Sequence, residues 1–240
     1  MNETTTKNSR QFYESSWDKW MDMKKYGPMS KHTRRLCAEI LRELDFKSIL
    51  DVGCGEGSFL KFLHLLRPHL EINGADISQV AIQQAGISLL NAKFFELDLE
   101  NNFIQQSFDL VTAIEVIEHI KNDTQFLANM HKMTIKYLLI CTLIGKMRPF
   151  EKEVGHLRNY SESQLIDKLN AAGFEILSIK KWGFPFYSPI YREILQYAPR
   201  DATTGKLGLT RKIISQLIYI LFFLNLHNRG DVIFVLARPK

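Results

Sequence analysis

A glycine-rich turn directly after a short apolar strand constrains this chain more than any other feature. Residues 48–52 (SILDV) are typical of a buried strand, and residues 53–57 (GCGEG) place a glycine at every second position. Glycine adopts backbone conformations that are closed to other residues, and its missing side chain lets a ligand approach the backbone. Ligands of open α/β sheets bind where strands end, so the turn predicts a binding site at the carboxyl end of this strand.

Helical and strand patterns alternate along the rest of the chain. Helices are expected at residues 31–44, 59–66, 80–90, 123–133 and 161–172, and strands at 48–52, 71–75, 93–97, 108–113, 137–143, 174–180 and 232–237. The helix at 161–172 has the clearest limits, because Ser161 and Gln164 form a capping-box pattern and Gly173 follows the last turn. Such regular alternation predicts an α/β fold with a doubly wound sheet.

The 240 residues are expected to form one domain with four parts. These are a partly flexible N-terminal segment (1–30), a ligand-binding core (31–180), an insertion (181–230) and a last strand (231–240). The insertion of about fifty residues is too long for a plain loop in a compact domain, so it should have structure of its own.

Composition narrows the classes of protein. With 45% apolar and 24% charged residues, the chain resembles a soluble globular protein. The net charge of +5 is modest and no basic run carries interleaved aromatics, so nucleic acid is not indicated as a partner. The three cysteines lie far apart, and residues 1–10 lack the apolar stretch of a signal peptide, so a cytoplasmic protein is expected.

The turn and four later segments resemble one enzyme family. Residues 50–57 (LDVGCGEG) look like the first motif of class I S-adenosyl-L-methionine (SAM)-dependent methyltransferases. The resemblance continues in order at residues 74–78 (GADIS), 96–99 (ELDL), 108–111 (FDLV) and 115–119 (EVIEH), and it covers roughly residues 30–180. The chain resembles methyltransferases of types 11 and 12, including the ubiquinone-pathway O-methyltransferases. The resemblance implies SAM as cofactor and a Rossmann-like sheet of seven strands, with an antiparallel last strand and the insertion as a helical cap.

The resemblance assigns the cofactor to a specific set of residues. Asp76 follows the glycines by about twenty residues, where a carboxylate can accept both ribose hydroxyls, although it could instead cap the next helix. Asp98 would accept from the adenine amino group, or be a solvated loop acid. The remaining residues would enclose the adenine (Ile77, Leu99), brace or line the methionine end (Asp51, Glu115), or offer turn backbone (Gly53, Gly55, Gly57).

Two histidines are candidates for the proton acceptor in methyl transfer. An oxygen or nitrogen acceptor must lose a proton, and histidine is suited to take it near neutral pH. His119 ends the 115–119 motif, and His156 lies in residues 155–160 (GHLRNY), which resemble a segment of small-molecule, sugar- and lipid-modifying methyltransferases. Each could equally have a structural role. If residues 115–119 are helical, Glu115 faces Glu118 and His119, and these three could hold a divalent metal with His156 as a fourth ligand.

The aromatic and apolar residues of the insertion allow several roles. Residues 181–187 (KWGFPFY) could form a substrate lid or pack in the core. Residues 213–226 are strongly apolar but shorter than the about twenty residues that span a bilayer. With Arg211 and Lys212 before them and His227 and Arg229 after them, they could lie at a membrane surface, line a lipid-sized pocket, form a dimer face or be buried.

The leading hypothesis is SAM-dependent methyl transfer to oxygen or nitrogen of a small-molecule or lipid-like acceptor. A nucleotide-linked oxidoreductase is one alternative, but its turn needs the spacing G-x-G-x-x-G, whereas this chain has G-x-G-x-G followed by Ser58. A SAM-binding scaffold without activity is the other.

Overall fold

The computed structural model describes Glu14, Trp17 and Trp20 and residues 22–198 and 204–240. The flexibility expected for residues 1–30 concerns mostly residues outside this set. Within it lies one seven-stranded sheet with the strand order β3-β2-β1-β4-β5-β7-β6. The strands are β1 (Ser48–Val52), β2 (Glu71–Asp76), β3 (Lys93–Glu96), β4 (Phe108–Ile114), β5 (Thr134–Leu143), β6 (Phe174–Trp182) and β7 (Val232–Pro239).

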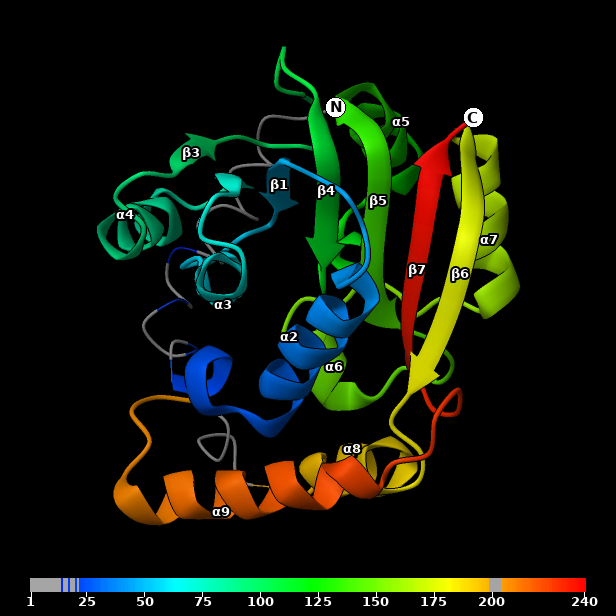
Figure 1. Ribbon diagram of the computed structural model, residues 1–240. Coiled ribbons are helices and arrows are strands. Elements are labelled where there is room, and N and C mark those ends of the chain that lie inside the picture. Colours follow the sequence, from blue (N-terminus) through cyan, green and yellow to red (C-terminus); the bar gives the residue numbers. More distant parts are fainter. Residues whose placement is uncertain (1–13, 15–16, 18–19, 21, 199–203) are drawn as a thin grey trace.

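The direction of the strands divides the sheet into a parallel and an antiparallel part. Neighbours among β3, β2, β1, β4 and β5 run parallel, whereas β7 is antiparallel to both β5 and β6. Figure 1 shows β7 inserted between these two long strands. The seven-stranded Rossmann-like sheet with an antiparallel last strand, expected from the resemblance, is therefore confirmed.

Helices cover both faces of the sheet because successive strand residues point to opposite sides. Ile49 packs on one face with α2 (Pro28–Leu41) and α3 (Ser58–Leu66), and α4 (Gln79–Ser88) lies beside them. Leu50 packs on the other face with α5 (Asp123–Met133) and α7 (Glu162–Ala171). The capping box of α7 is confirmed, since Ser161 Oγ accepts from Gln164 N at 3.1 Å and Gln164 Oε1 accepts from Ser161 N at 2.9 Å.

The insertion forms helices that join the end of the molecule at which the glycine turn lies. It comprises the irregular turn η2 (Phe186–Tyr191), α8 (Arg192–Leu195), α9 (Leu209–Leu221) and the short turn η3 (Phe222–Leu224). In Figure 1, α9 runs along the lower end, and the contacts place it against α2. Trp182, Tyr187 and Phe222 belong to the main core cluster, so part of the expected aromatic lid is core instead.

No helix among the described residues is both long and apolar enough to cross a membrane.

Candidate functional site

The glycine turn after β1 has the backbone that only glycine adopts easily. Gly53, Gly55 and Gly57 have φ angles of 69°, 55° and 79°, all in the left-handed region. The turn is held against β2, since the amides of Gly53 and Cys54 donate to the carbonyl of Ala75 at 2.7 and 3.1 Å. The turn therefore presents glycine backbone at the carboxyl end of β1, as the sequence predicts.

Gly55 shows why a side chain is excluded from this turn. A Cβ atom at Gly55 would lie 2.3 Å from the indole of Trp17, far inside contact distance. Trp17 comes from the N-terminal segment, which the sequence interpretation did not include in the site. No pattern in residues 1–30 marks it, because its role depends on the path of the chain before α2.

A small cavity of about 60 Å³ opens at this turn. Asp51, Gly53, Gly55 and Glu115, four of the residues expected at the cofactor, line it. The N-terminal segment and α2 supply side chains that the sequence interpretation missed, namely Trp17, Lys24, Ser30, Thr33 and Arg34. The cavity is thus closed on one side by residues that precede the sheet.

Asp76 ends β2 and braces the glycine turn. One carboxylate oxygen accepts from Gly55 N and the other from Ser78 N, both at 2.9 Å. Burial raises the pKa of Asp76, and the backbone donors oppose that shift. The alternative role as a helix cap is wrong, because Ser78 caps α4 by accepting from Ala81 N at 3.3 Å.

The other acids expected near the cofactor have different surroundings. Asp51 accepts from Thr112 Oγ1 at 2.5 Å, and burial raises its pKa to about 7. Asp98 is half-buried after β3, where it accepts from Glu100 N at 3.1 Å and Asn101 Nδ2 at 2.7 Å. Leu99 is buried and Ile77 is half-buried, and neither they nor Asp98 and Gly57 line the cavity described above.

Glu115 is not helical, which corrects the geometry expected for the 115–119 motif. Its φ angle is 56°, and its amide donates to Cys141 O at 2.8 Å. Its carboxylate pairs with Lys24 Nζ at 3.2 Å. Burial alone would raise the pKa of Glu115, but the ammonium of Lys24 outweighs burial and the net pKa lies below its ordinary value.

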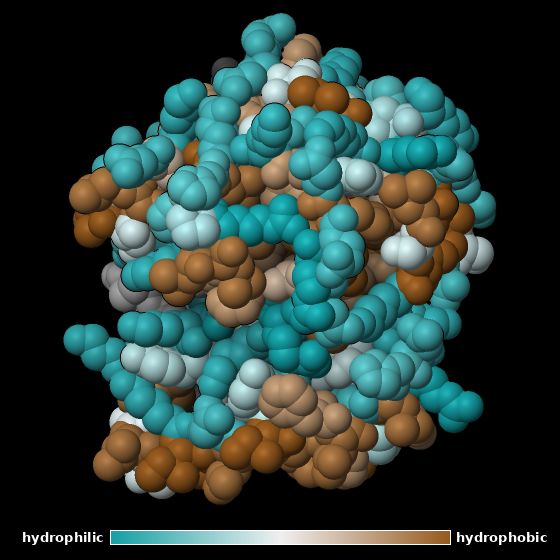
Figure 2. Space-filling view, viewed as in Figure 1, coloured by the Kyte–Doolittle hydropathy of each residue, from teal (hydrophilic) through white to brown (hydrophobic). Residues whose placement is uncertain are grey.

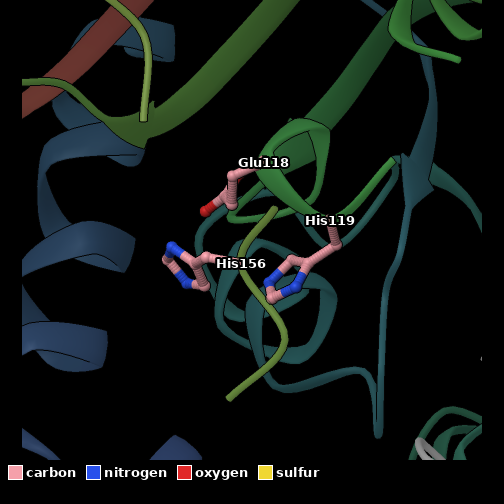
Figure 3. A group of neighbouring side chains, drawn as sticks. All are labelled: Glu118, His119 and His156. Carbon is pink, nitrogen blue, oxygen red and sulfur yellow. The ribbon is translucent and has the colours of Figure 1, made fainter. Parts of the chain in front are cut away.

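Three side chains, Glu118, His119 and His156, form a cluster after β4 (Figure 3). Glu118 and His119 belong to η1 (Ile117–His119) after β4, and His156 lies in the loop after α6 (Pro149–Glu153). One ligand atom from each falls within 4.8 Å of the others, and the two imidazoles meet edge to face with centroids 4.7 Å apart. The metal ligands expected from the sequence were Glu115, Glu118 and His119. This expectation is corrected, because the Glu115 carboxylate faces Lys24 and His156 lies with Glu118 and His119 instead.

Near pH 7 the carboxyl group of Glu118 and the imidazoles of His119 and His156 are uncharged. Burial raises the pKa of Glu118 to about 8, and burial lowers the pKa of His119 to about 3. Burial also lowers the pKa of His156. Thr142 Oγ1 donates to Glu118 Oε2 at 2.8 Å, whereas the buried Glu118 Oε1 has no hydrogen-bond partner among the described residues.

A buried ion pair fixes the loop that carries His156. His156 N donates to the backbone carbonyl of Glu151 at 2.9 Å, and the Glu151 carboxylate accepts from Arg192 Nε at 2.9 Å. Both charged side chains are almost fully buried, and Arg192 also pairs with Asp231 at 2.5 Å. The insertion, through α8, therefore holds the His156 loop in place. Sequence reasoning missed this link because its bonded partners are about forty positions apart.

A larger hollow of about 410 Å³ lies where β6 meets η2. Phe184, Pro189 and Arg229 are among its lining residues, and it shares none with the cavity at the glycine turn.

Comparisons with known proteins agree with the geometry. The family described as methyltransferase domain matches residues 50–134. The chain is 25% identical over 119 residues to a ribosomal RNA small subunit methyltransferase C of Buchnera aphidicola, covering 47% of this chain and 36% of that protein. It is 30% identical over 107 residues to a ubiquinone biosynthesis O-methyltransferase of Rickettsia akari, covering 41% of this chain and 40% of the relative. The chain thus spans about two fifths of these relatives.

A solved structure extends the likeness to the whole fold. The N-methyltransferase NodS from Bradyrhizobium japonicum, in complex with S-adenosyl-L-homocysteine, superposes with a TM-score of 0.61 over 98% of both chains at 15% identity. At that identity the likeness concerns the fold. Residues 50–134 are thus similar to a methyltransferase domain, and the fold as a whole is similar to that of a solved methyltransferase.

Proposed function

We propose that this protein transfers the methyl group of SAM to an oxygen or nitrogen atom of a small-molecule or lipid-like acceptor. The observation that carries the proposal is the glycine turn, whose cavity is lined by Asp51 and Glu115 and braced by Asp76. The relatives matched by sequence are methyltransferases, which favours methyl transfer over the oxidoreductase alternative. Retention of every expected acid at the site argues against an inactive scaffold.

The roles of the cofactor residues form part of this proposal. Asp76 binds the ribose hydroxyls while bracing the turn, since a carboxylate oxygen can accept a second hydrogen bond. Glu115, with its lowered pKa, is an anion that attracts the ammonium of the methionine end. Glycine backbone meets the same end at Gly53, Gly55 and Gly57. Asp98 accepts from the adenine amino group, with Ile77 and Leu99 on the ring faces.

The histidine pair serves the acceptor rather than the cofactor. Bound SAM supplies an electrophilic methyl group that needs alignment more than acid catalysis. An O–H or N–H acceptor releases a proton as the new bond forms, and a neutral imidazole of His119 or His156 can take it. Their lowered pKa values keep both imidazoles neutral near pH 7. We assign the insertion, residues 181–230, as a cap in the same domain that shields this reaction from water.

The acceptor class and partners also belong to the proposal. Among the relatives, the ubiquinone biosynthesis O-methyltransferase supports a small or lipid-like acceptor. Residues 213–226 fit two partners, a membrane surface or a second copy of the chain, and the surrounding charges favour the first. This would make the protein cytoplasmic and peripheral to a membrane.

Binding and transfer of labelled methyl groups test the function. Purified protein should bind SAM with micromolar affinity by calorimetry and should transfer its labelled methyl group to one fraction of a metabolite extract. Asp76→Ala should weaken binding at least tenfold, about 1.4 kcal/mol, because the ribose loses a charged acceptor. Asp109→Ala, which alters an acid at the amino end of β4, away from the glycine turn, is the control. Absence of SAM binding in the folded protein would overturn the proposal.

A divalent metal is a separate proposal for the histidine cluster. Glu118, His119 and His156 offer one carboxylate and two imidazoles within 4.8 Å, and the unpartnered Glu118 Oε1 fits a ligand there. A metal at these residues would orient an acceptor oxygen. Zinc or magnesium should then raise the melting temperature of the wild type but not of Glu118→Gln. Equal melting temperatures with and without metal would exclude this site.

A further inference from the structure

We infer that α9 and η3 form a docking face for the surface of an anionic lipid bilayer. The docking face consists of the outward apolar side chains of these two elements: Leu209, Ile213, Ile214, Leu217, Ile220, Leu221, Phe223 and Leu224. It is independent of methyl transfer, since neither the glycine turn nor the histidine cluster belongs to it. Figure 2 shows hydrophobic surface along the lower edge, where α9 runs in Figure 1.

The exposure of these side chains is far greater than packing requires. Leu209, Ile213, Leu217, Ile220 and Leu224 are 77%, 53%, 61%, 56% and 62% exposed. They follow one another at intervals of three or four residues, so they form one stripe along the helix. Contiguous apolar patches of this kind are uncommon on monomeric proteins and mark interaction sites.

The opposite side of α9 already has its partner. Phe222 is buried beside Trp182 and Tyr187, and Ser215 Oγ donates to the carbonyl of Tyr26 at 2.6 Å. His32 of α2 lies 4.5 Å from the ring centre of Tyr219. Because these contacts hold the inner side of the helix against the domain, the exposed stripe faces away from it and is open to another surface.

The charges around the docking face indicate the kind of surface that would bind there. Residues 202–230 contain no aspartate or glutamate but carry Lys206, Arg211, Lys212 and Arg229. The neighbouring helix α2 adds Lys31 and Arg35, whose cationic groups lie 4.1 Å and 5.0 Å from the rings of Tyr219 and Phe223. This basic rim consists of the six residues just named.

Among the rim cations, Arg35 pairs with Glu39 at 3.3 Å, and near Lys206 the carboxylate of Asp22 accepts from Leu207 N at 2.6 Å. With four cations and no acid, residues 202–230 carry a formal charge of +4 when histidine is neutral. A second copy would bring the same cations face to face around a two-fold axis, whereas anionic headgroups complement them. A lipid surface fits both the apolar stripe and the rim.

The length of α9 determines how the helix would lie relative to a membrane. The 13 residues of α9 span about 20 Å, which is shorter than the hydrocarbon core of about 30 Å. The helix would therefore lie parallel to the membrane, with its apolar stripe among the acyl chains and its basic rim at the phosphates, as interfacial amphipathic helices do.

Vesicle flotation of the full protein tests the docking face. Wild type should float with vesicles of phosphatidylcholine and phosphatidylglycerol at 3:1 and bind at least tenfold more weakly to phosphatidylcholine alone, because anionic headgroups attract the cations of the rim. Ile213→Glu with Leu217→Glu should reduce binding at least tenfold. Leu65→Glu with Leu90→Glu, at 73% and 87% exposure elsewhere on the surface, is the matched control and should bind as wild type. All variants should melt within a few degrees of one another.

A second variant separates charge from apolar contact. Lys206→Gln with Lys212→Gln should lose most of the preference for the anionic vesicles while keeping the weaker binding to phosphatidylcholine. Absence of flotation by the wild type would overturn the proposal, and so would equal binding by the docking-face and control variants. A dimer in light scattering that Ile213→Glu with Leu217→Glu dissolves, without vesicle binding, would assign the face to a second copy instead.

Discussion

Single residues at the candidate site combine structural and chemical tasks. Asp76 holds the amides of Gly55 and Ser78, and Glu115 pairs with Lys24. Such side chains are preorganised before a ligand arrives, because their positions are already set by protein groups. A substitution at Asp76 therefore affects both the turn and the ligand.

The histidine pair gives the first prediction. His119→Ala or His156→Ala should lower turnover about a hundredfold on an acceptor that must lose a proton, since general base catalysis contributes on that order. SAM affinity should stay nearly unchanged because the proposal assigns neither imidazole to the cofactor. Steady-state rates and calorimetry measure the two effects. Normal turnover by both variants would show that neither histidine is the base.

His32 gives a prediction for stability against pH. Its buried ring stacks on Trp182, and burial lowers its pKa to about 4 from an ordinary 6.5. Between these values the unfolded chain binds a proton that the folded protein does not, so stability should fall as the pH drops from about 6.5 to 4. The loss attributable to this group is at most about 3 kcal/mol.

His32→Phe keeps the stacking but removes the titration. The free energy of unfolding, measured in urea at pH 7 and pH 4.5, should therefore fall less for the variant than for the wild type. The measurement at pH 7 serves as the internal control for the lost hydrogen bond to Tyr219 O, 2.9 Å in length. An equal fall in both proteins would contradict the lowered pKa.

Elements show how much of the fold the sequence contains. All seven expected strands form, and β1 (Ser48–Val52) and α5 (Asp123–Met133) have the expected limits. Periodicity and capping are local, so they are readable from sequence. The helix hypothesised for residues 115–119 was wrong because the chain must turn sharply after β4, where Glu115 takes a left-handed conformation. The contacts of Lys24 and Arg192 depend on tertiary structure and leave no local pattern.

The link between α8 and the His156 loop gives an element-scale prediction. Arg192→Met should lower the free energy of unfolding by about 3–5 kcal/mol, because Glu151 would keep a buried charge without its partner. Adding Glu151→Gln should recover part of that loss. Arg238→Met, which breaks the exposed pair with Glu175, should change stability by no more than about 1 kcal/mol. A change below 1 kcal/mol for Arg192→Met would contradict the structural role.

At the scale of the whole molecule, the insertion contributes to the common core. Tyr187 and Phe222 pack in the same cluster as Leu139 of β5 and Phe234 of β7. A cap attached only at its ends would lack such contacts. Replacing residues 183–230 with a short linker would remove these side chains from the core, so truncation is a poor test of the cap.

Thermal unfolding should accordingly show one cooperative transition. Calorimetry should give a calorimetric enthalpy equal to the van't Hoff enthalpy, as for other single domains. Limited proteolysis should release no stable fragment that lacks residues 183–230. Two resolved transitions, or a folded fragment without α9, would contradict the shared core.

Trp17 lines the glycine-turn cavity and provides an intrinsic fluorescent probe there. The chain has three tryptophans, and Trp182 is sealed in the core, whereas the Trp17 indole touches the turn itself. Its emission therefore reports on the surroundings of Gly55 without any added dye. Occupation of the cavity and movement of the N-terminal segment can therefore be followed by fluorescence, with a Trp17→Phe protein as the reference that retains only the emission of Trp20 and Trp182.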